Sequence, residues 1–201
     1  MNRGEKAVAV IGTVVNRKHI TEVELAKLID AAAANRWSER DQTMLQFAFR
    51  HGLRVSELVA LRWQDVDWAG KNVVIMRRKQ RTASGTRPNV HPLAPEEIKG
   101  LKRLFADYGS DSDFVFATER KGDDSRFLGF TTSGFSKLLR RLEAKAGIHN
   151  FGPHALRHGR AQSLADQGHD AFLIRDALGH ANVATSNAYV AASPERLRGV
   201  L

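Results

Sequence analysis

The chain has 201 residues, 42% of them hydrophobic and 26% charged, which is enough to bury a core and excludes a disordered chain. It contains no cysteine, which excludes disulfides and thiolate metal sites, and no apolar run reaches the roughly 18 residues needed to cross a bilayer. The formal net charge is +9, and chains this basic most often bind nucleic acid, less often an anionic membrane.

The first third of the chain predicts an arm followed by helices. The apolar stretch 7–15 is too short for a membrane span and reads as an edge strand or an arm, so residues 1–19 are taken as an N-terminal arm. Thr21 followed by Glu24 forms a capping box that opens a helix. The helices expected here are residues 21–33, 38–51 and 54–68.

A basic β-hairpin is predicted in the middle of the chain. The β-branched segment 71–78 predicts a strand, the polar segment 79–88 a turn, and residues 89–93 a returning strand. No acidic residue occurs from Ala69 to Pro95, which is typical of a surface that approaches phosphates. The basic residues of this segment are Lys71, Arg77, Arg78, Lys79, Arg81 and Arg87, and the four arginines are candidate DNA-binding residues.

The remainder is predicted to be helical, with one apolar segment (113–118) before a polar loop (119–126). The expected helices are residues 95–108, 131–147, 152–168 and 170–179, a brief helix or turn at 184–190, and a last helix at 193–201 capped by Ser193. The fold class is therefore a single mainly α domain carrying a small antiparallel β-sheet or hairpin.

Several chemically useful side chains stand out, although each has an ordinary explanation on its own. His154 and Arg157 share one face of a predicted helix, but such a pair often arises by chance. Arg54 beside Glu57 could be a surface ion pair. Lys79 could be one solvated lysine among other basic residues. The remaining candidates are His180 and Tyr189, which follow in that order nine residues apart.

Taken together, these residue types are the set needed for transesterification at a phosphodiester without a metal. Two arginines neutralise the charge that develops on a pentacoordinate phosphate. A histidine can take the tyrosine proton, and a lysine can protonate the leaving oxygen. The tyrosine oxygen attacks and holds the phosphate covalently. No cluster of Asp and Glu of the metal-nuclease kind accompanies them, so neither a metal nor another cofactor is expected.

In order and spacing, the motifs GLRVSEL, RRKQ, HALRH and LGH, with a tyrosine nine residues later, resemble the tyrosine recombinases, the phage integrase family. The resemblance covers almost the whole chain and implies the catalytic-domain fold of that family. It implies that Glu57 lies behind the catalytic residues and holds them in position. The catalytic residues it implies are Arg54, Lys79, His154, Arg157, His180 and Tyr189.

Two departures from the family pattern matter. Most members add an N-terminal core-binding domain, whereas here we expect only the arm 1–19 before a catalytic domain at 20–201 with a tail at 191–201. In this the chain resembles the short fimbrial phase-variation recombinases, or it is a truncated form. The hairpin also lacks the usual glycine-lysine-glycine tip, which leaves Lys71 as an alternative to Lys79.

The resemblance implies a site-specific DNA recombinase that works through a 3′-phosphotyrosyl intermediate. The alternatives are a type IB topoisomerase-like enzyme that relaxes DNA, and a DNA-binding regulator that has lost cleavage. The expected partners are double-stranded DNA with specific recombination sites and further copies of the chain, as a homo-oligomer and in particular a tetramer on DNA. The tail would dock on a neighbouring subunit or fold back onto its own chain. We expect a cytoplasmic, nucleoid-associated protein with no membrane partner.

Overall fold

The computed structural model describes residues 18–82, 85–148, 151–179 and 182–191. The predicted arm up to residue 17 and the helix expected at 193–201 lie outside the described residues. The α-helices of the described part are α1 (Glu22–Ala33), α2 (Ser38–Arg50), α3 (Val55–Leu58), α4 (Pro95–Tyr108), α5 (Thr132–Lys145), α6 (His154–Asp166), α7 (Ala171–Leu178) and α8 (Ala184–Ala191). The mainly helical fold expected from the sequence is confirmed.

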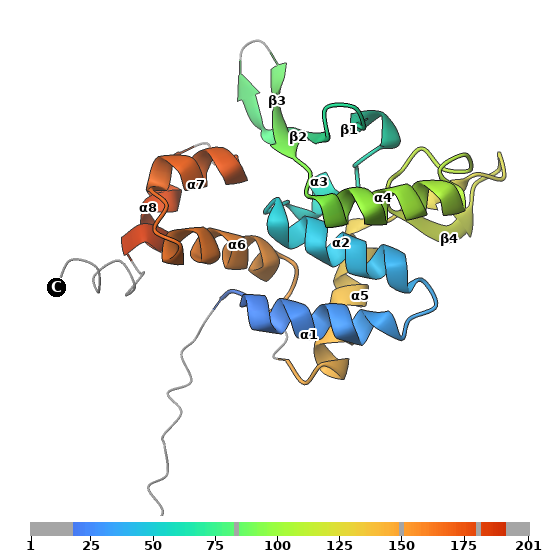
Figure 1. Cartoon of the computed structure of the whole chain (residues 1–201), viewed down its shortest axis with the longest axis horizontal. Helices are drawn as coiled ribbons and strands as arrows, with labels where there is room; N and C mark the ends of the chain where they lie inside the picture. Colours follow the sequence, from blue (N-terminus) through green and yellow to red (C-terminus); the bar gives the residue numbers. More distant parts are fainter. Residues whose placement is uncertain (1–17, 83–84, 149–150, 180–181, 192–201) are drawn as a thin grey trace, which may run out of the picture.

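Two small antiparallel sheets complete the fold. The first has the order β1-β2-β3, formed by β1 (Val66–Asp67), β2 (Asn72–Thr82) and β3 (Gly85–Pro92). The second pairs β4 (Ala117–Lys121) with β5 (Phe127–Gly129). In Figure 1 the β2–β3 hairpin projects away from the helices, while α6, α7 and α8 form a group at one end of the molecule.

Two hydrophobic clusters hold the described part together. The larger lies among α1, α2, α4 and α5 and includes the fully buried Phe47, Phe116 and Phe135. The smaller lies among α6, α7 and α8, where Tyr189 and Val190 pack against buried aliphatic residues. Burial of apolar area is the main stabilising contribution to both clusters. Tyr189 is thereby held on the side of α6 by packing within one chain.

Helix α6 approaches the rest of the core very closely at Gly159. A Cβ on this glycine would lie 2.1 Å from the backbone oxygen of Ile20 and 2.8 Å from the ring of Phe49. The backbone N–H of Ile20 donates to the carbonyl of Ala155, one turn earlier, at 3.1 Å. The missing side chain at position 159 therefore lets α6 lie directly against α2 and the segment before α1.

The helix predicted at 54–68 is wrong beyond its first turn. The chain forms α3 only to Leu58, then a short 3₁₀ helix (Trp63–Asp65) and β1. Trp63 N–H donates to Asp113 O, and Val115 N–H donates to Leu61 O, both at 3.0 Å. These hydrogen bonds between distant segments of the chain use the backbone groups that a continued helix would need.

Two predicted polar connections are also corrected. Residues 79–88 are not a turn throughout, because β2 continues to Thr82 and Arg81 pairs with Thr86 across the hairpin. The loop predicted at 119–126 begins later, because β4 runs to Lys121, which pairs with Phe127. Polar residues are less common in strands than β-branched and aromatic ones, so composition alone points to loops there.

Within the described ranges, no helix is long and apolar enough to cross a membrane.

Candidate active site

The site is built around a sharp turn after α2. Gly52 has a φ of +55°, a left-handed conformation that glycine adopts without strain. The turn directs Arg54 to the start of α3, where its backbone N–H donates to Glu57 Oε2 at 2.8 Å. Nη1 of the same arginine donates to Glu57 Oε1 at 2.7 Å. The buried carboxylate of Glu57 thus fixes both the backbone and the guanidinium of Arg54.

Arg157 reaches the same carboxylate from α6. It is only 6% exposed, and its Nη1 donates to the backbone oxygen of Gly52 at 2.6 Å. The same nitrogen lies 4.0 Å from Glu57 Oε2. The structure therefore brings Arg54 and Arg157 together on the two oxygens of one carboxylate. Two guanidinium groups in this arrangement are suited to binding a phosphate.

Tyr189, on α8, lies next to this pair. Its hydroxyl forms a short hydrogen bond with Nδ1 of His158, the residue that follows Arg157 on α6. The two rings are 6.0 Å apart and tilted by 36°. The chain's other tyrosine, Tyr108, is buried, and its hydroxyl donates to the backbone oxygen of Val115 at 2.7 Å. Tyr108 is therefore a core residue, whereas the Tyr189 hydroxyl contacts a ring nitrogen of His158.

The surroundings of this pair set its protonation. Burial raises the pKa of Tyr189, while the positive charge of Arg157 opposes that rise. Burial is also the main cause that lowers the pKa of His158 from its usual 6.5, and nearby positive charges lower it further. At neutral pH the tyrosine is protonated and the histidine is neutral. The Tyr189 O–H can then donate to the imidazole Nδ1.

The other predicted site residues are placed less fully. His154 is the first residue of α6 and is exposed, one turn before Arg157. Lys79 lies in β2, within the register irregularity between Met76 and Arg81, and its side chain is outside the described part of the structure. The same holds for the side chains of Arg77, Arg78, Arg81 and Arg87, and the whole of His180 lies outside the described residues. Lys71, the alternative lysine, is an exposed turn residue with a φ of +55°.

The structure also reveals a buried polar chain that the sequence did not indicate. Nε2 of His51, at the end of α2, lies 3.1 Å from Glu97 Oε1, in the first turn of α4. Nδ1 of His51 lies 3.3 Å from Nδ1 of His91 on β3. All three side chains are buried. They tie the base of the hairpin to the helix end that precedes Gly52.

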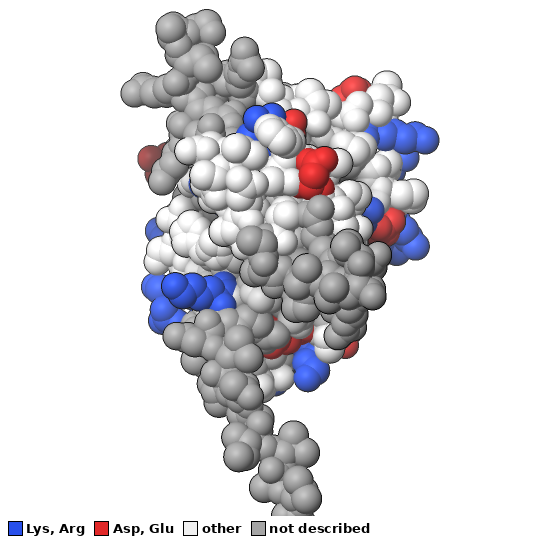
Figure 2. Space-filling view, turned by 90° about the vertical axis from the view of Figure 1, so that its left-hand side faces the viewer, with Lys and Arg blue, Asp and Glu red and all other residues white. Residues whose placement is uncertain are grey.

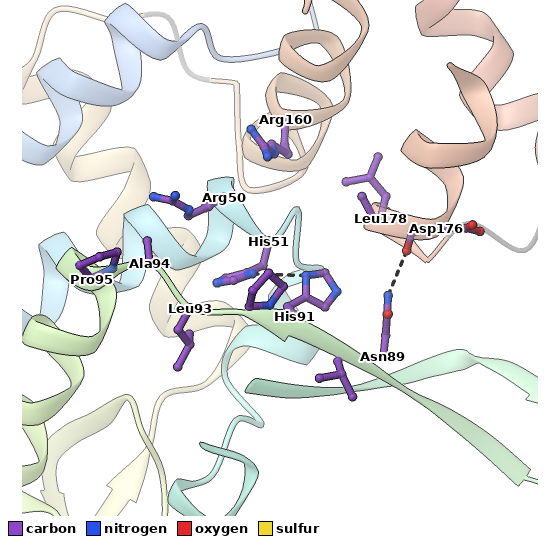
Figure 3. A pocket seen from close by; sticks show the side chains of 13 residues that line it. Arg50, His51, Asn89, His91, Leu93, Ala94, Pro95, Arg160, Asp176 and Leu178 are labelled. Carbon is purple, nitrogen blue, oxygen red and sulfur yellow. Dashed lines mark hydrogen bonds between the residues drawn. The ribbon is translucent and has the colours of Figure 1, made fainter. Parts of the chain in front are cut away.

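The histidines of this buried polar group, His51 and His91, border a cleft of about 630 Å³ between β3, α2, α6 and the end of α7. Figure 3 shows Arg50 and His51 at the end of α2, Arg160 on α6, and the hydrogen bond from His51 to His91. Asn89 donates to the backbone oxygen of Asp176 at 3.0 Å across the cleft. The hairpin is therefore attached both to α2 and to the end of α7, the helix that leads to position 180.

His158 is the main site residue that sequence reasoning missed. It was visible as the last letter of HALRH, but nothing in the sequence shows which histidine contacts the tyrosine. Among the described residues, no group of three or more His, Cys, Asp or Glu could hold a metal ion. The expectation that no metal or other cofactor takes part stays a prediction.

The model of the phage integrase family matches residues 18–196, most of the chain. The chain belongs to the phage integrase family. The type 1 fimbriae regulatory protein FimE of Escherichia coli K12 is 30% identical over 190 residues, which covers 92% of this chain and 90% of FimE. The family is that of the tyrosine recombinases, as the sequence predicted.

Solved structures support the same assignment. The XerA recombinase is 30% identical with a TM-score of 0.71, and the match covers 90% of this chain and 63% of XerA. The XerH site-specific recombinase bound to its difH substrate in a post-cleavage complex has a TM-score of 0.71 at 23% identity. That match covers 90% of this chain and 52% of XerH, and it shows the likeness of fold alone. XerA and XerH are named as recombinases, FimE is named as a fimbriae regulatory protein, and none of the three is named as a topoisomerase.

Proposed function

We propose that this chain is a site-specific recombinase that cuts and rejoins DNA strands, with Tyr189 as the nucleophile. One observation carries the proposal. Arg54 and Arg157 meet on the carboxylate of Glu57, and the Tyr189 hydroxyl is bonded to the residue beside Arg157. A phosphate bound by the two guanidinium groups would lie close to a tyrosine oxygen. The recombinases among the chain's relatives support this reading.

The reaction exchanges one phosphodiester for another. The Tyr189 oxygen forms a bond to the phosphorus, and the bond from phosphorus to the 5′ oxygen breaks. The products are a 3′-phosphotyrosyl link and a strand with a free 5′-hydroxyl. A 5′-hydroxyl from the partner site then attacks the link and releases the tyrosine. Because the energy of the ester bond is retained, the cycle needs no ATP.

Each predicted residue has a role in this scheme. Arg54 and Arg157 neutralise the charge that grows on the phosphate. In our proposal this step therefore needs no metal ion. Lys79, from the hairpin, protonates the leaving 5′ oxygen. His154 and His180 complete the phosphate contacts. Glu57 orients both arginines.

The partners in this proposal are double-stranded DNA and further copies of the chain. The net charge of +9 and the basic hairpin (Arg77, Arg78, Arg81, Arg87) favour binding to the DNA backbone. Figure 2 shows the α7–α8 end, where Lys and Arg lie mainly towards the margins of the described surface. On α7, Phe172 is 61% exposed and its neighbour Leu173 is also exposed. We assign this end to contacts between subunits of a DNA-bound tetramer. In this proposal the protein acts in the cytoplasm, on the DNA of the nucleoid.

The proposal is tested by capturing the covalent intermediate. The protein is incubated with sheared genomic DNA of its source organism, denatured in SDS, and the protein-linked fragments are sequenced. Recovered fragments that share a short site support the proposal, and plasmids with two such sites are then assayed for inversion or excision. Relaxation of supercoils without any exchange between the sites would contradict the recombinase assignment. Failure to recover linked DNA would contradict cleavage altogether.

A further inference from the structure

We propose that His158 accepts the proton of the Tyr189 hydroxyl as the tyrosine attacks DNA. This inference rests on the recombinase function proposed above and concerns the same site. The sequence predicted that a histidine takes the tyrosine proton, without showing which one, and its candidate site histidines were His154 and His180. The geometry points instead to the histidine between Arg157 and Gly159.

The first argument is contact. Among the described residues, His158 is the histidine whose ring nitrogen is hydrogen-bonded to the Tyr189 hydroxyl. Both residues are half-buried on packed helices, since α8 lies against α6 and Tyr189 packs on the small hydrophobic cluster. A proton acceptor has to lie within hydrogen-bond reach of the proton that it takes. His154, in contrast, is exposed at the start of α6.

The second argument is that His158 lies beside the phosphate clamp, the name we give to the guanidinium groups of Arg54 and Arg157. It follows Arg157 directly, and Arg157 is held by Gly52 and Glu57. The tyrosine oxygen can therefore keep its bond to His158 while a phosphate approaches from the arginine side. One short helical segment then supplies both a phosphate ligand and the proton acceptor.

The third argument is protonation. The groups that face the His158 ring are Tyr189 from α8, His154 and Arg157 from its own helix, and Lys18 and His19 from the segment before α1. The positive charges among them, together with burial, lower the pKa of His158. The imidazole is thus neutral at physiological pH and has a free lone pair at Nδ1 to accept the proton.

The step balances as follows. The bond from the Tyr189 oxygen to phosphorus forms while the O–H proton passes to His158 Nδ1. The bond from phosphorus to the 5′ oxygen breaks, and the leaving oxygen takes a proton from Lys79. His158 is then a cation beside a phosphodiester. When the 5′-hydroxyl of the partner strand attacks, its proton passes to the neutral Lys79, the bond from the Tyr189 oxygen to phosphorus breaks, and His158 returns its proton to Tyr189.

The test is single-turnover cleavage of a nicked suicide duplex that carries the captured site, measured from pH 5 to 9. His158→Asn keeps an amide near the place of Nδ1 and preserves a hydrogen bond, but it cannot accept a proton. His158→Ala removes the group. His169→Asn, in the turn after α6, is the matched control because His169 lies outside the site.

We expect His158→Asn to bind the duplex normally and to cleave about 100-fold more slowly, in the range that general bases contribute. The native rate should rise with pH through the lowered pKa of His158 and then level off, because the neutral form is the active one. That rising limb should be absent in His158→Asn. Added imidazole should restore part of the cleavage by His158→Ala, an effect that a purely structural role would not give.

Near-native cleavage by His158→Asn with an unchanged pH profile would overturn the assignment. Faster cleavage by His158→Asn or His158→Ala would also overturn it, since it would mean that His158 restrains the nucleophile. These outcomes are distinct from failure of the proposed function. In that case the native chain itself would form no covalent complex, whatever stands at position 158.

Discussion

The backbone oxygen of Gly52 accepts a 2.6 Å hydrogen bond from Nη1 of Arg157, which joins two segments 105 residues apart in the chain. The bond forms because Gly52 adopts a left-handed conformation at the end of α2. The carbonyl of this glycine thereby fixes the direction of the buried Arg157 guanidinium. If the two arginines bind a phosphate as we propose, this backbone group helps to position one of them.

Gly52→Ala should impair both stability and cleavage. A left-handed φ costs a residue with a Cβ about 1–2 kcal/mol, and the new Cβ would lie 2.1 Å from Cδ2 of the buried Leu178. We expect the free energy of unfolding to fall by at least that amount in denaturant titrations. Cleavage should fall as well, because the carbonyl that holds Arg157 must move.

The chain offers a matched control in Gly147→Ala. Gly147 also has a positive φ of +65°, but a Cβ there would meet nothing within 4 Å. This variant should lose a similar strain energy and keep native cleavage. Equal loss of cleavage in both variants would show that the Gly52–Arg157 bond is not what matters.

Glu57→Gln should loosen both arginines. The buried carboxylate contacts both Arg54 and Arg157, and removing one member of a buried ion pair costs about 3–5 kcal/mol. The isosteric amide keeps the volume, so we expect a smaller loss of stability and a large loss of cleavage rate. Glu119→Gln, at an exposed pair with Arg36, is the control and should change neither quantity measurably. An unchanged cleavage rate in Glu57→Gln would count against the orienting role.

Arg157→Lys should separate binding from chemistry. Lysine keeps the positive charge but lacks the planar fork that can contact Gly52, Glu57 and a phosphate together. Cleavage should fall at least about 100-fold, as when one donor to a developing negative charge is removed. Salt-dependent binding of the duplex, measured by fluorescence anisotropy, should remain close to native. Near-normal cleavage would remove Arg157 from the clamp.

The buried chain of His51, His91 and Glu97 should contribute to stability. His51→Leu would leave the Glu97 carboxylate buried with fewer polar partners, and we expect the free energy of unfolding to fall by about 1–3 kcal/mol. Replacing Glu97 by Gln in the same chain should cost less than the sum of the two single changes. His169→Leu, at a half-exposed position, is the control. Additive losses would indicate that the two side chains are not coupled.

Much of the fold could be predicted from local signals. The capping box at Thr21 is confirmed, with Glu24 donating and accepting as expected. Pro95 begins α4, and Gly179 ends α7 in a left-handed conformation. These predictions succeeded because helix ends depend on side chains within one turn of the chain.

The errors lie where backbone pairing overrides local preference. Residues after Leu58 read as a helix, but they bond to the segment 113–115 instead. The polar tip of the hairpin reads as a turn, but it pairs as a strand as far as Thr82. After Leu58 the deciding hydrogen-bond partner lies far along the chain, and periodicity cannot show such a partner. At the hairpin tip Arg81 pairs with Thr86 inside the same polar segment, so there the polar composition itself misled the prediction.

The same limit applies to the site. The spacing of the motifs predicted Arg54, Arg157 and Tyr189, and the structure brings these three into one region. The role of His158 depends on how α8 packs against α6, a contact between residues 31 apart that no motif encodes. The carbonyl of Gly52 has no sequence signature beyond the glycine itself.

The central claim is that Tyr189 carries the DNA during strand exchange, and peptide mapping of the covalent complex tests it most directly. The trapped complex is digested with nuclease and trypsin, and the nucleotide-bearing peptide is identified by mass spectrometry, with Tyr108→Phe as the control variant. We predict that the adduct lies on Tyr189, is unchanged in Tyr108→Phe and is lost in Tyr189→Phe. An adduct on any other residue, or one that persists in Tyr189→Phe, would contradict the account.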